Sequence, residues 1–223
     1  MIIPLPFDSE LFGYPVGKSK IDDSWDEQKF LLEASDFRLL YLFSDEIVKR
    51  SNSLIVHHDT KLVFWKSLTE SKQKAQLDLY QGPLTDEICK LAFLSGAKSR
   101  FKTDPFFQNQ EFEKLYLIWI KKAIEKKQLL AFPQLEGMVT LEVENGHAKV
   151  GLLAVSESHQ GKGLGSQLVS GAEHFAWQHG ASSIEIATQE RNKAAVKLYQ
   201  KQGYELSSRT YIYHFCNSSY YID

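Results

Sequence analysis

The alternation of apolar and polar positions is clearest in the C-terminal half of the chain. Apolar residues occupy every second position from Val139 to Val143, which predicts a strand over 137–144 with one buried face. Asn145-Gly146 follows, a strong signal for a two-residue hairpin turn, and the return strand is predicted over 147–156. This hairpin delivers the chain to a glycine-rich stretch.

Helical spacing follows that stretch. A stripe of apolar residues predicts a helix that runs from Ser166 to His179 and ends near Gly180. The stripe consists of Leu164, Leu168, Ala172, Phe175 and Ala176. A short strand is predicted over 184–188. A second helix is predicted over 192–204 with Gly203 as its stop, and a terminal strand pair after it.

Upstream, two more helices and a strand are predicted. Thr85 is a suitable N-cap for a helix over 86–94, and a longer helix over 111–127 has four apolar residues at helical spacing: Phe112, Leu115, Trp119 and Ala123. A strand over 129–132 precedes the hairpin. In the first 84 residues the patterns are shorter: an aromatic-rich turn over 7–15, strands over 16–21, 37–43 and 62–65, and a helix over 25–34. The elements together indicate an α/β (α+β) protein.

Composition narrows the class of protein. The chain has 223 residues, of which 43% are apolar, and this apolar content is ample for a packed core. Its formal net charge of -2 gives no electrostatic footprint for nucleic acid. No stretch approaches the roughly 18 apolar residues of a membrane span, and the start lacks the basic region of a signal peptide. With only two cysteines, Cys89 and Cys216, read as reduced thiols, we expect a cytoplasmic protein without nucleic-acid or membrane partners.

The adjacent histidines His57 and His58 raise the question of a metal site. Neighbouring residues on a strand point to opposite faces, so both could not easily bind one ion. We therefore expect surface histidines and no metal.

The glycine-rich stretch, Gln160 to Ser166, is the strongest chemical signal. Glycines at 161, 163 and 165 let main-chain N–H groups approach a ligand, and the following helix adds the positive end of its dipole. The spacing matches neither the P-loop nor the Rossmann fingerprint. We predict a seat for a phosphate or pyrophosphate, while a structural helix entry remains an equal alternative.

A second stretch, 99–107, mixes two cations with three phenylalanines. Arg100 and Lys102 could bind a diphosphate beside a flat ring. Core aromatics next to solvated charges explain the same composition.

Two motifs at a fixed separation are similar to a known family. Gln160, Gly163 and Gly165 fit the pattern Q/R-x-x-G-x-G/A, and residues 192–204 read N-x-x-A-x-x-L-Y-x-x-x-G-Y. Together they resemble the GCN5-related N-acetyltransferases (the GNAT family), and the resemblance covers the chain from about residue 100 to its end. It implies a mixed, mostly antiparallel sheet flanked by helices and splayed beside the glycine loop, with acetyl-CoA as co-substrate and no metal.

Shorter strings resemble one branch of that family, which acetylates the 4-amino group of dTDP-4-amino-4,6-dideoxy-D-galactose. They are Phe12-Gly13, Ser99-Arg100-Phe101, Gly151-Leu152-Leu153-Ala154, Ala187-Thr188-Gln189 with Asn192-Lys193-Ala194-Ala195, and Tyr211-Ile212-Tyr213. That branch has an additional small α/β N-terminal domain. The resemblance thus implies an N-terminal domain over 1–90, acceptor-binding or structural, and a GNAT domain over 91–223.

The resemblance also assigns roles to residues. Tyr199 would be the general acid that protonates the departing thiolate of coenzyme A, and one N–H of Leu153, Ala154 or Val155 would face the oxyanion. The residues implied to bind acetyl-CoA are Leu153, Ala154, Val155, Gln160, Gly161, Lys162, Gly163, Leu164, Gly165, Ser166 and Asn192. Within the predicted helix Asn192 and Tyr199 share a face.

The acceptor side is less defined. The branch implies a dTDP-linked amino-deoxysugar, with Arg100 and Lys102 at its diphosphate, whereas other members of the family acetylate protein N-termini, lysines or small amines. A non-catalytic acyl-CoA-binding module is a further alternative. Three residues are candidates for a general base: Glu142, Glu185 and His147. Ordinary surface charge is the alternative explanation for each of them. Relatives of the sugar-nucleotide type often form homodimers.

Overall fold

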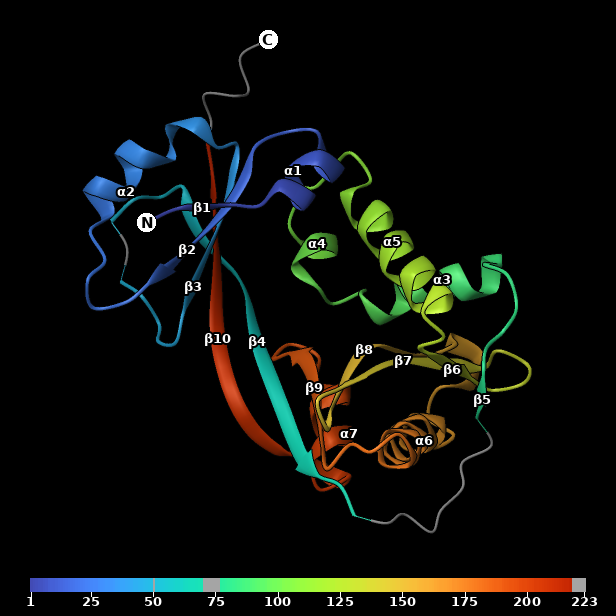
Figure 1. Cartoon of the computed structure of the whole chain (residues 1–223). Helices are drawn as coiled ribbons and strands as arrows, with labels where there is room; N and C mark the ends of the chain where they lie inside the picture. Colours follow the sequence, from blue (N-terminus) through green and yellow to red (C-terminus); the bar gives the residue numbers. More distant parts are fainter. Residues whose placement is uncertain (50, 70–76, 218–223) are drawn as a thin grey trace. The chain divides into compact units, whose positions relative to one another are not determined.

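The chain folds into two compact units, seen in a computed structural model that describes residues 1–49, 51–69 and 77–217 (Figure 1). The first unit comprises Met1–Lys61, Ser99–Glu111 and Arg209–Asp223, and the second comprises Leu62–Lys98 and Phe112–Ser208. Three stretches that are distant in sequence therefore build the first unit.

The first unit is built on a mixed sheet with strand order β1-β2-β3-β10-β4. β2 pairs in parallel with β3, whereas β1 is antiparallel to β2 and β10 is antiparallel to β3. Its elements are β1 (Ile3–Pro4), α1 (Pro6–Phe12), β2 (Val16–Ile21), α2 (Glu27–Glu33), η1 (Ala34–Asp36), β3 (Leu39–Ser44) and α4 (Arg100–Thr103), with parts of β4 (Ile55–Ser67) and β10 (Glu205–Cys216).

The predicted aromatic-rich turn over 7–15 is wrong in its first half, because α1 occupies Pro6–Phe12. Pro6 lies at the start of this helix, where its missing N–H has no acceptor to lose, and Gly13 ends it in the left-handed region at φ 79°. The predicted strand over 16–21 is confirmed. α2 begins two residues later than predicted, because the side chain of Asp26 caps it by accepting from the N–H of Lys29.

Aromatic side chains fill part of the first unit. Phe101 is 7% exposed, and its ring centroid lies 6.4 Å from that of Phe12 and 5.3 Å from that of Phe107. The ring of Tyr14 meets that of Phe106 edge to face at 5.8 Å. The phenylalanines of the 99–107 stretch are thus packed against other aromatic residues, as in the second of the two interpretations.

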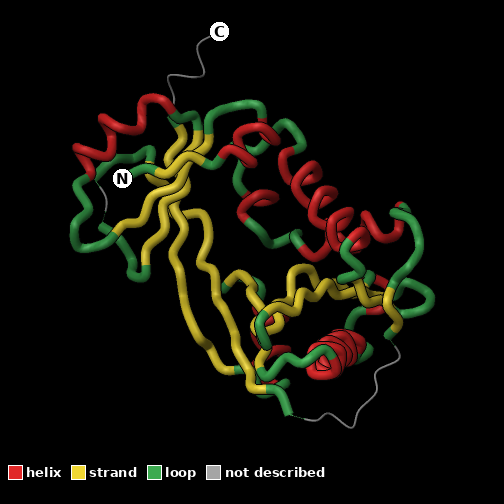
Figure 2. The backbone as a smooth tube through the Cα atoms, viewed as in Figure 1, coloured by secondary structure: helices red, strands yellow, loops and turns green. Residues whose placement is uncertain are grey.

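The second unit contains a longer part of the sheet, in the order β4-β9-β8-β7-β6-β5. Pairing is antiparallel from β5 to β8 and parallel between β8 and β9. Its elements are β5 (Asp78–Leu79), α3 (Asp86–Ser95), α5 (Glu111–Glu125), β6 (Leu129–Ala131), β7 (Gly137–Glu144), β8 (His147–Val155), η2 (Glu157–His159), α6 (Leu164–Gln178), β9 (Ser183–Gln189) and α7 (Lys193–Lys201) (Figure 2).

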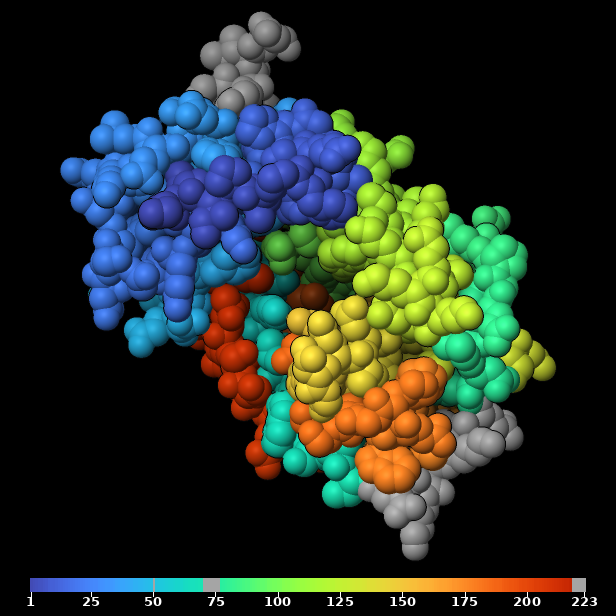
Figure 3. Space-filling model, viewed as in Figure 1, coloured from blue at the N-terminus to red at the C-terminus, as the bar shows by residue number. Residues whose placement is uncertain are grey.

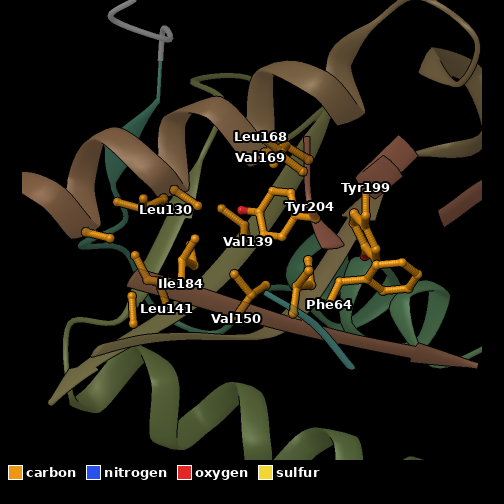
Figure 4. Close-up of a cluster of buried hydrophobic side chains, with 14 of the residues drawn as sticks. Phe64, Leu130, Val139, Leu141, Val150, Leu168, Val169, Ile184, Tyr199 and Tyr204 are labelled. Atoms are coloured by element: carbon orange, nitrogen blue, oxygen red, sulfur yellow. The ribbon is translucent and has the colours of Figure 1, made fainter. Parts of the chain in front are cut away.

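The hairpin of β7 and β8 confirms its prediction. Asn145 and Gly146 have φ angles of 50° and 76°, the pair of positive values that a tight two-residue turn of this kind requires. Side chains from both strands, among them Val139, Leu141 and Val150, enter a core that also contains Leu168 of α6 (Figure 4). The period-two pattern in the sequence therefore marks the buried face of this hairpin.

Helices cover both faces of the sheet in the second unit, with α3 and α5 on one side and α6 on the other (Figure 1). α5 also forms part of the outer surface (Figure 3). On α5 the prediction that Trp119 belongs to the core stripe is wrong, because Trp119 is 37% exposed while Tyr116 and Ile120 are buried. The Trp119 ring packs against that of Tyr116 at 4.9 Å.

Two long strands belong to both units. β4 runs over Ile55–Ser67 and β10 over Glu205–Cys216, so the predicted terminal strand pair is one continuous strand instead. From Tyr211 to Cys216, β10 pairs with β3 near the start of the chain. The compact units therefore divide the chain differently from the expected boundary at residue 90, which stays a prediction about sequence domains.

Within the described ranges, no helix combines the length and the apolar content that a membrane crossing needs. Cys89 and Cys216 are both free thiols.

Candidate functional site

Strand β8 carries one extra residue in its middle. Pairing with β7 runs through Val139↔Leu153 and resumes at Leu141↔Val150, so two steps along β7 match three along β8. This is a β-bulge, which bends a strand and increases its twist. The N–H of Leu152, within the bulge, donates to the hydroxyl oxygen of Thr140 at 2.7 Å.

The bulge coincides with the point where β8 leaves β9. The two strands pair in parallel from His147↔Ser183 to Val150↔Ile186, although β8 continues to Val155 and β9 to Gln189. Among the described residues, no strand pairs with 151–155 on the β9 side. The sheet is therefore splayed here, as the resemblance of the two motifs implied.

The residues predicted to hold the pantetheine arm lie on this splayed segment. Leu153, Ala154 and Val155 pair with β7 along their other edge. Ala154 is buried, whereas Leu153 and Val155 are half-buried. An extended ligand could add to the free edge of β8 by main-chain hydrogen bonds, as an added strand would.

The glycine loop begins directly after the splayed segment. Gly161 and Gly163 have φ angles of 77° and 82°, and a Cβ at either position would meet no atom within 4 Å. The glycines are therefore needed for backbone conformation rather than for close packing inside the protein. Gly163 is the residue that caps the start of α6.

The main-chain N–H groups of the loop are largely available. Within the described part of the chain, those of 161–165 donate to no other main-chain group. Ser166 differs from the prediction, because its N–H donates to the carbonyl of Gly163 at 3.1 Å. The N–H groups at the start of a helix together with its dipole form a favourable place for a phosphate.

Side-chain hydrogen bonds to nearby carbonyl groups stabilise the loop. The side-chain nitrogen of Gln160 donates to the carbonyl of Val155 at 3.1 Å, and the Lys162 ammonium donates to the carbonyl of Ser158 at 2.9 Å. Gln160 therefore ties the loop to the end of β8. The third glycine, Gly165, has another role, because a Cβ there would lie 3.2 Å from Leu198 of α7. Leu164 beside it is partly buried against the hydrophobic core.

Asn192 precedes α7 rather than belonging to it, which corrects the prediction that it shares a helix face with Tyr199. Its side-chain oxygen accepts from the N–H of Ala195 at 3.4 Å and so caps the helix. The side-chain NH₂ group of Asn192 is the donor that remains for a ligand. Gly203, at φ 80°, follows the helix as its predicted stop.

Tyr199 is 4% exposed and lies in the core of the second unit (Figure 4). Its ring packs against Phe64 at 5.8 Å and Tyr204 at 6.1 Å. Burial raises the pKa of the Tyr199 phenol above its ordinary value, because an apolar surrounding disfavours the charged form. No hydrogen-bond partner of its hydroxyl is found among the described residues.

The three candidate bases lie at the other end of β8. Glu142 and Glu185 are the β7 and β9 neighbours of Lys149, and the Glu185 carboxylate is 3.3 Å from the Lys149 ammonium. His147 bonds to Ser183 at 2.9 Å. At about 3.3 Å per residue, Lys149 is roughly 13 to 20 Å along the strand from Leu153–Val155. This separation places all three candidates away from the splayed segment.

Arg100 and Lys102 lie in the first unit, on α4. The Arg100 guanidinium carbon is 4.9 Å from the centre of the Tyr41 ring and 4.3 Å from that of Phe101. Its Nε is buried and has no hydrogen-bond partner within the described ranges. Lys102 is exposed.

The prediction of two surface histidines holds for His57 and is wrong for His58. His57 is exposed and its Nε2 lies 3.0 Å from the hydroxyl of Thr60. The His58 ring stacks on that of His214 at 4.7 Å and lies beside the carboxylate of Asp104. No pattern in the sequence indicated this group, because its members are far apart along the chain.

Thr140 is a second residue that sequence reasoning missed. Within a strand that alternates regularly, its hydroxyl looks like an ordinary polar position, and the bulge that it stabilises lies on the partner strand. The only local hint is Gly151, where a Cβ would come within 2.7 Å of that hydroxyl.

A model of the Acetyltransferase (GNAT) family matches residues 87–204, more than half of the chain. The dTDP-fucosamine acetyltransferase of Escherichia coli O6:H1 is 32% identical over 130 residues, 55% of this chain and 55% of that protein. The chain also matches two uncharacterised N-acetyltransferases of Bacillus subtilis, and covers 28% of YobR and 36% of YhfO. The chain thus spans about half the length, or less, of these curated relatives.

Solved structures are similar in fold. A GCN5-related N-acetyltransferase from Sphaerobacter thermophilus superposes with a TM-score of 0.57 at 12% identity, covering 96% of this chain and 75% of that one. A functionally unknown protein from Staphylococcus epidermidis gives 0.58 at 12% identity, with 94% and 88% covered. At such identities the likeness concerns the fold, a mixed sheet flanked by helices.

Proposed function

Because the chain belongs to the acetyltransferase (GNAT) family, we propose that it transfers an acetyl group from acetyl-CoA to a primary amine. The observation that carries this proposal is the splayed end of β8 beside the glycine loop. One edge of 151–155 is free of strand pairing, and the N–H groups of 161–165 lie directly after it. Acetyl-CoA has matching parts: an extended pantetheine arm with amide groups, followed by a pyrophosphate.

In this arrangement the pyrophosphate binds at the start of α6, where Gly161 and Gly163 give the loop its conformation. The pantetheine lies along Leu153–Val155, and Asn192 donates its side-chain NH₂ to it. A main-chain N–H of that segment faces the thioester oxygen, which gains negative charge as the amine attacks. The amine nitrogen forms a bond to the carbonyl carbon, and the carbon–sulfur bond then breaks.

The thiolate of coenzyme A that departs needs a proton, and we assign its donor to Tyr199. A buried phenol with a raised pKa stays protonated at neutral pH and can donate to sulfur. Its hydroxyl is free of partners among the described residues, as a donor to a bound group requires. The acceptor attacks as a neutral amine, so its ammonium form first loses a proton to water, and the nitrogen loses a second proton to water once the new bond has formed. Water takes this role since Glu142, Glu185 and His147 lie at the far end of β8.

For the acceptor we propose a dTDP-linked amino-deoxysugar acetylated on its 4-amino group. The support is the relative named for dTDP-fucosamine, at 32% identity over 130 residues. Arg100, whose buried Nε has no hydrogen-bond partner among the described residues, would contact the diphosphate together with Lys102. We place this reaction in the cytoplasm, where acetyl-CoA and nucleotide sugars are found.

Product analysis by mass spectrometry tests the proposal. The purified chain is incubated with acetyl-CoA and, separately, with a dTDP-4-amino-sugar, a peptide N-terminus, a lysine peptide and a small amine. We expect an acetylated product and free coenzyme A with the nucleotide sugar. Acetylation of another amine alone would overturn the acceptor, and binding of acetyl-CoA with no product from any amine would indicate a binding module.

A further inference from the structure

The first unit contains a cluster of three metal-binding side chains, His58, Asp104 and His214. One ring nitrogen of each histidine and one carboxylate oxygen of Asp104 lie within 4.8 Å of one another. The Asp104 Oδ2 is 2.5 Å from His214 Nδ1 and 3.5 Å from His58 Nε2. Both imidazoles thus face the same carboxylate oxygen.

The donor types of the cluster, two imidazole nitrogens and one carboxylate oxygen, are those of a zinc site. Zinc binds histidine nitrogen and carboxylate oxygen at about 2.0 to 2.2 Å in a tetrahedron, which puts neighbouring donor atoms about 3.4 Å apart. In the cluster, the two distances from Asp104 Oδ2 to the histidine nitrogens are 2.5 Å and 3.5 Å, one below and one just above this spacing. Small side-chain rotations would bring the three donors onto one ion and leave a fourth position for water.

The carboxylate is already oriented for such a role. Asp104 Oδ1 accepts from the backbone N–H of Phe106 at 2.9 Å, which directs Oδ2 towards the two rings. The His214 ring packs against the rings of Tyr41 at 5.2 Å and Phe107 at 5.8 Å. Supporting contacts of this kind fix metal ligands in known sites.

Each of the three stretches that build the first unit supplies one of these residues. His58 belongs to Met1–Lys61, Asp104 to Ser99–Glu111 and His214 to Arg209–Asp223. An ion bound here would link β4, the end of α4 and β10. Asp104 and His214 are buried, whereas the His58 side chain is 18% exposed and offers a route from solvent.

We propose that His58, Asp104 and His214 bind one divalent transition metal ion, with Zn²⁺ as the metal that suits the site. Two nitrogen donors and one oxygen donor favour zinc and its neighbours over Mg²⁺ and Ca²⁺, which prefer oxygen ligands. The other nitrogen of His214, Nε2, is buried without a partner within the described ranges. Its proton would stay unpaired in the metal-bound form, so the site lacks one of the outer contacts that strengthen metal binding in known sites.

Calorimetry with Zn²⁺ tests the site on the full chain, prepared without a histidine tag and stripped with EDTA. We expect one equivalent to bind. His58→Ala should weaken binding at least about 10-fold, whereas His57→Ala, which removes the adjacent exposed histidine of the same strand, should leave it unchanged. Equal affinity of the two variants, or no stoichiometric binding to the wild type, would overturn the proposal.

Cobalt gives a second measurement on the unmodified chain, which keeps the test valid if His58→Ala does not fold. Co²⁺ bound by two imidazoles and a carboxylate in a tetrahedral site absorbs visible light. We expect these bands to appear at one equivalent and to disappear when Zn²⁺ is added. A spectrum identical to that of aqueous cobalt would show that the cluster is a hydrogen-bonded group without a metal.

Discussion

The hydroxyl oxygen of Thr140 accepts a hydrogen bond from the backbone N–H of Leu152, with 2.7 Å between Oγ1 and N, and both residues are buried. The bond satisfies an N–H that the bulge has removed from the regular ladder between β7 and β8. Directly before the bulge, at Val150, the pairing of β8 with β9 ends. One threonine hydroxyl therefore stabilises the bend that opens the sheet.

Replacing Thr140 with Val should lower both stability and co-substrate binding. The N–H of Leu152 would be buried without an acceptor, which costs about 1 to 3 kcal/mol. We expect a loss of that size in the free energy of unfolding, measured in urea, and weaker binding of acetyl-CoA by calorimetry. Thr140→Ser retains the hydroxyl and should stay near the wild type. A Val variant as stable as the Ser variant would refute the role of this hydrogen bond.

Gly163 offers a test of the phosphate seat. Its φ of 82° is strained for an alanine by roughly 1 to 2 kcal/mol, although a Cβ would meet no atom within 4 Å. Gly163→Ala should therefore reorient the N–H groups at the start of α6 and weaken acetyl-CoA binding about 10-fold, since about 1.4 kcal/mol corresponds to a factor of ten. Calorimetry measures this affinity.

Asparagine provides the matched control at this position, because it adopts the left-handed conformation more readily than alanine. Gly163→Asn should bind acetyl-CoA better than Gly163→Ala. If the two variants bind alike, the conformation at this position does not determine the affinity.

Local signals were sufficient to predict several elements of the second unit from sequence. Alternation and Asn145-Gly146 predicted the hairpin, and helical spacing with Gly203 predicted α7, since these features act between neighbours in the chain. α1 was missed although Pro6 and Gly13 are start and stop signals, because the aromatic residues between them suggested a turn.

Tertiary contacts explain what the sequence could not predict. The bulge depends on the side chain of Thr140 from a neighbouring strand, and the cluster around Asp104 joins residues from three separate stretches. No pattern along the chain encodes such encounters. Trp119 is a further example, because it has the helical spacing of a core residue but is 37% exposed.

Glu27 should make stability depend on pH in the first unit. Its carboxylate accepts from the Ser51 hydroxyl at 2.7 Å and from the N–H of Asn52 at 2.8 Å, and these bonds lower the pKa of Glu27 below its ordinary value. A lowered pKa stabilises the fold above the unfolded value of about 4.3, and this contribution is lost as pH falls through the folded value.

Glu27→Gln should therefore reduce stability at pH 7, by no more than about 1 kcal/mol because the site is near the surface. The difference from the wild type should shrink as the pH is lowered below about 4. Urea unfolding at several pH values measures it. A difference that is constant with pH would mean that the charge of Glu27 contributes nothing.

Arg100 is tested by removing its charge while keeping much of its stem. Arg100→Met preserves apolar contact with the rings of Tyr41 and Phe101, so that a change in nucleotide binding reports on the guanidinium. Hydrogen bonds to a charged group contribute about 1.5 to 3 kcal/mol, so we expect dTDP affinity to fall at least about 10-fold. Lys114→Met, at an exposed lysine of α5, is the control. Equal dTDP affinity of the two variants would remove Arg100 from the acceptor site.

Tyr199→Phe should abolish most turnover and leave the fold intact. The ring would still pack against Phe64 and Tyr204, so the melting temperature should not change. Loss of the acid should lower kcat by about 100-fold or more, with little effect on the KM for acetyl-CoA. Steady-state kinetics measure both constants.

The buried neighbour Tyr204 gives the matched control, because Tyr204→Phe removes a phenol hydroxyl from the same core while its ring can still pack against the unchanged Tyr199. The raised pKa of Tyr199 adds a pH test. An acid acts only while protonated, and a pKa above the ordinary value of about 10 keeps Tyr199 protonated throughout the neutral and mildly alkaline range. The kcat of the wild type should therefore show no fall assignable to this phenol below about pH 10. If Tyr199→Phe and Tyr204→Phe turn over equally fast, the thiolate receives its proton from another group.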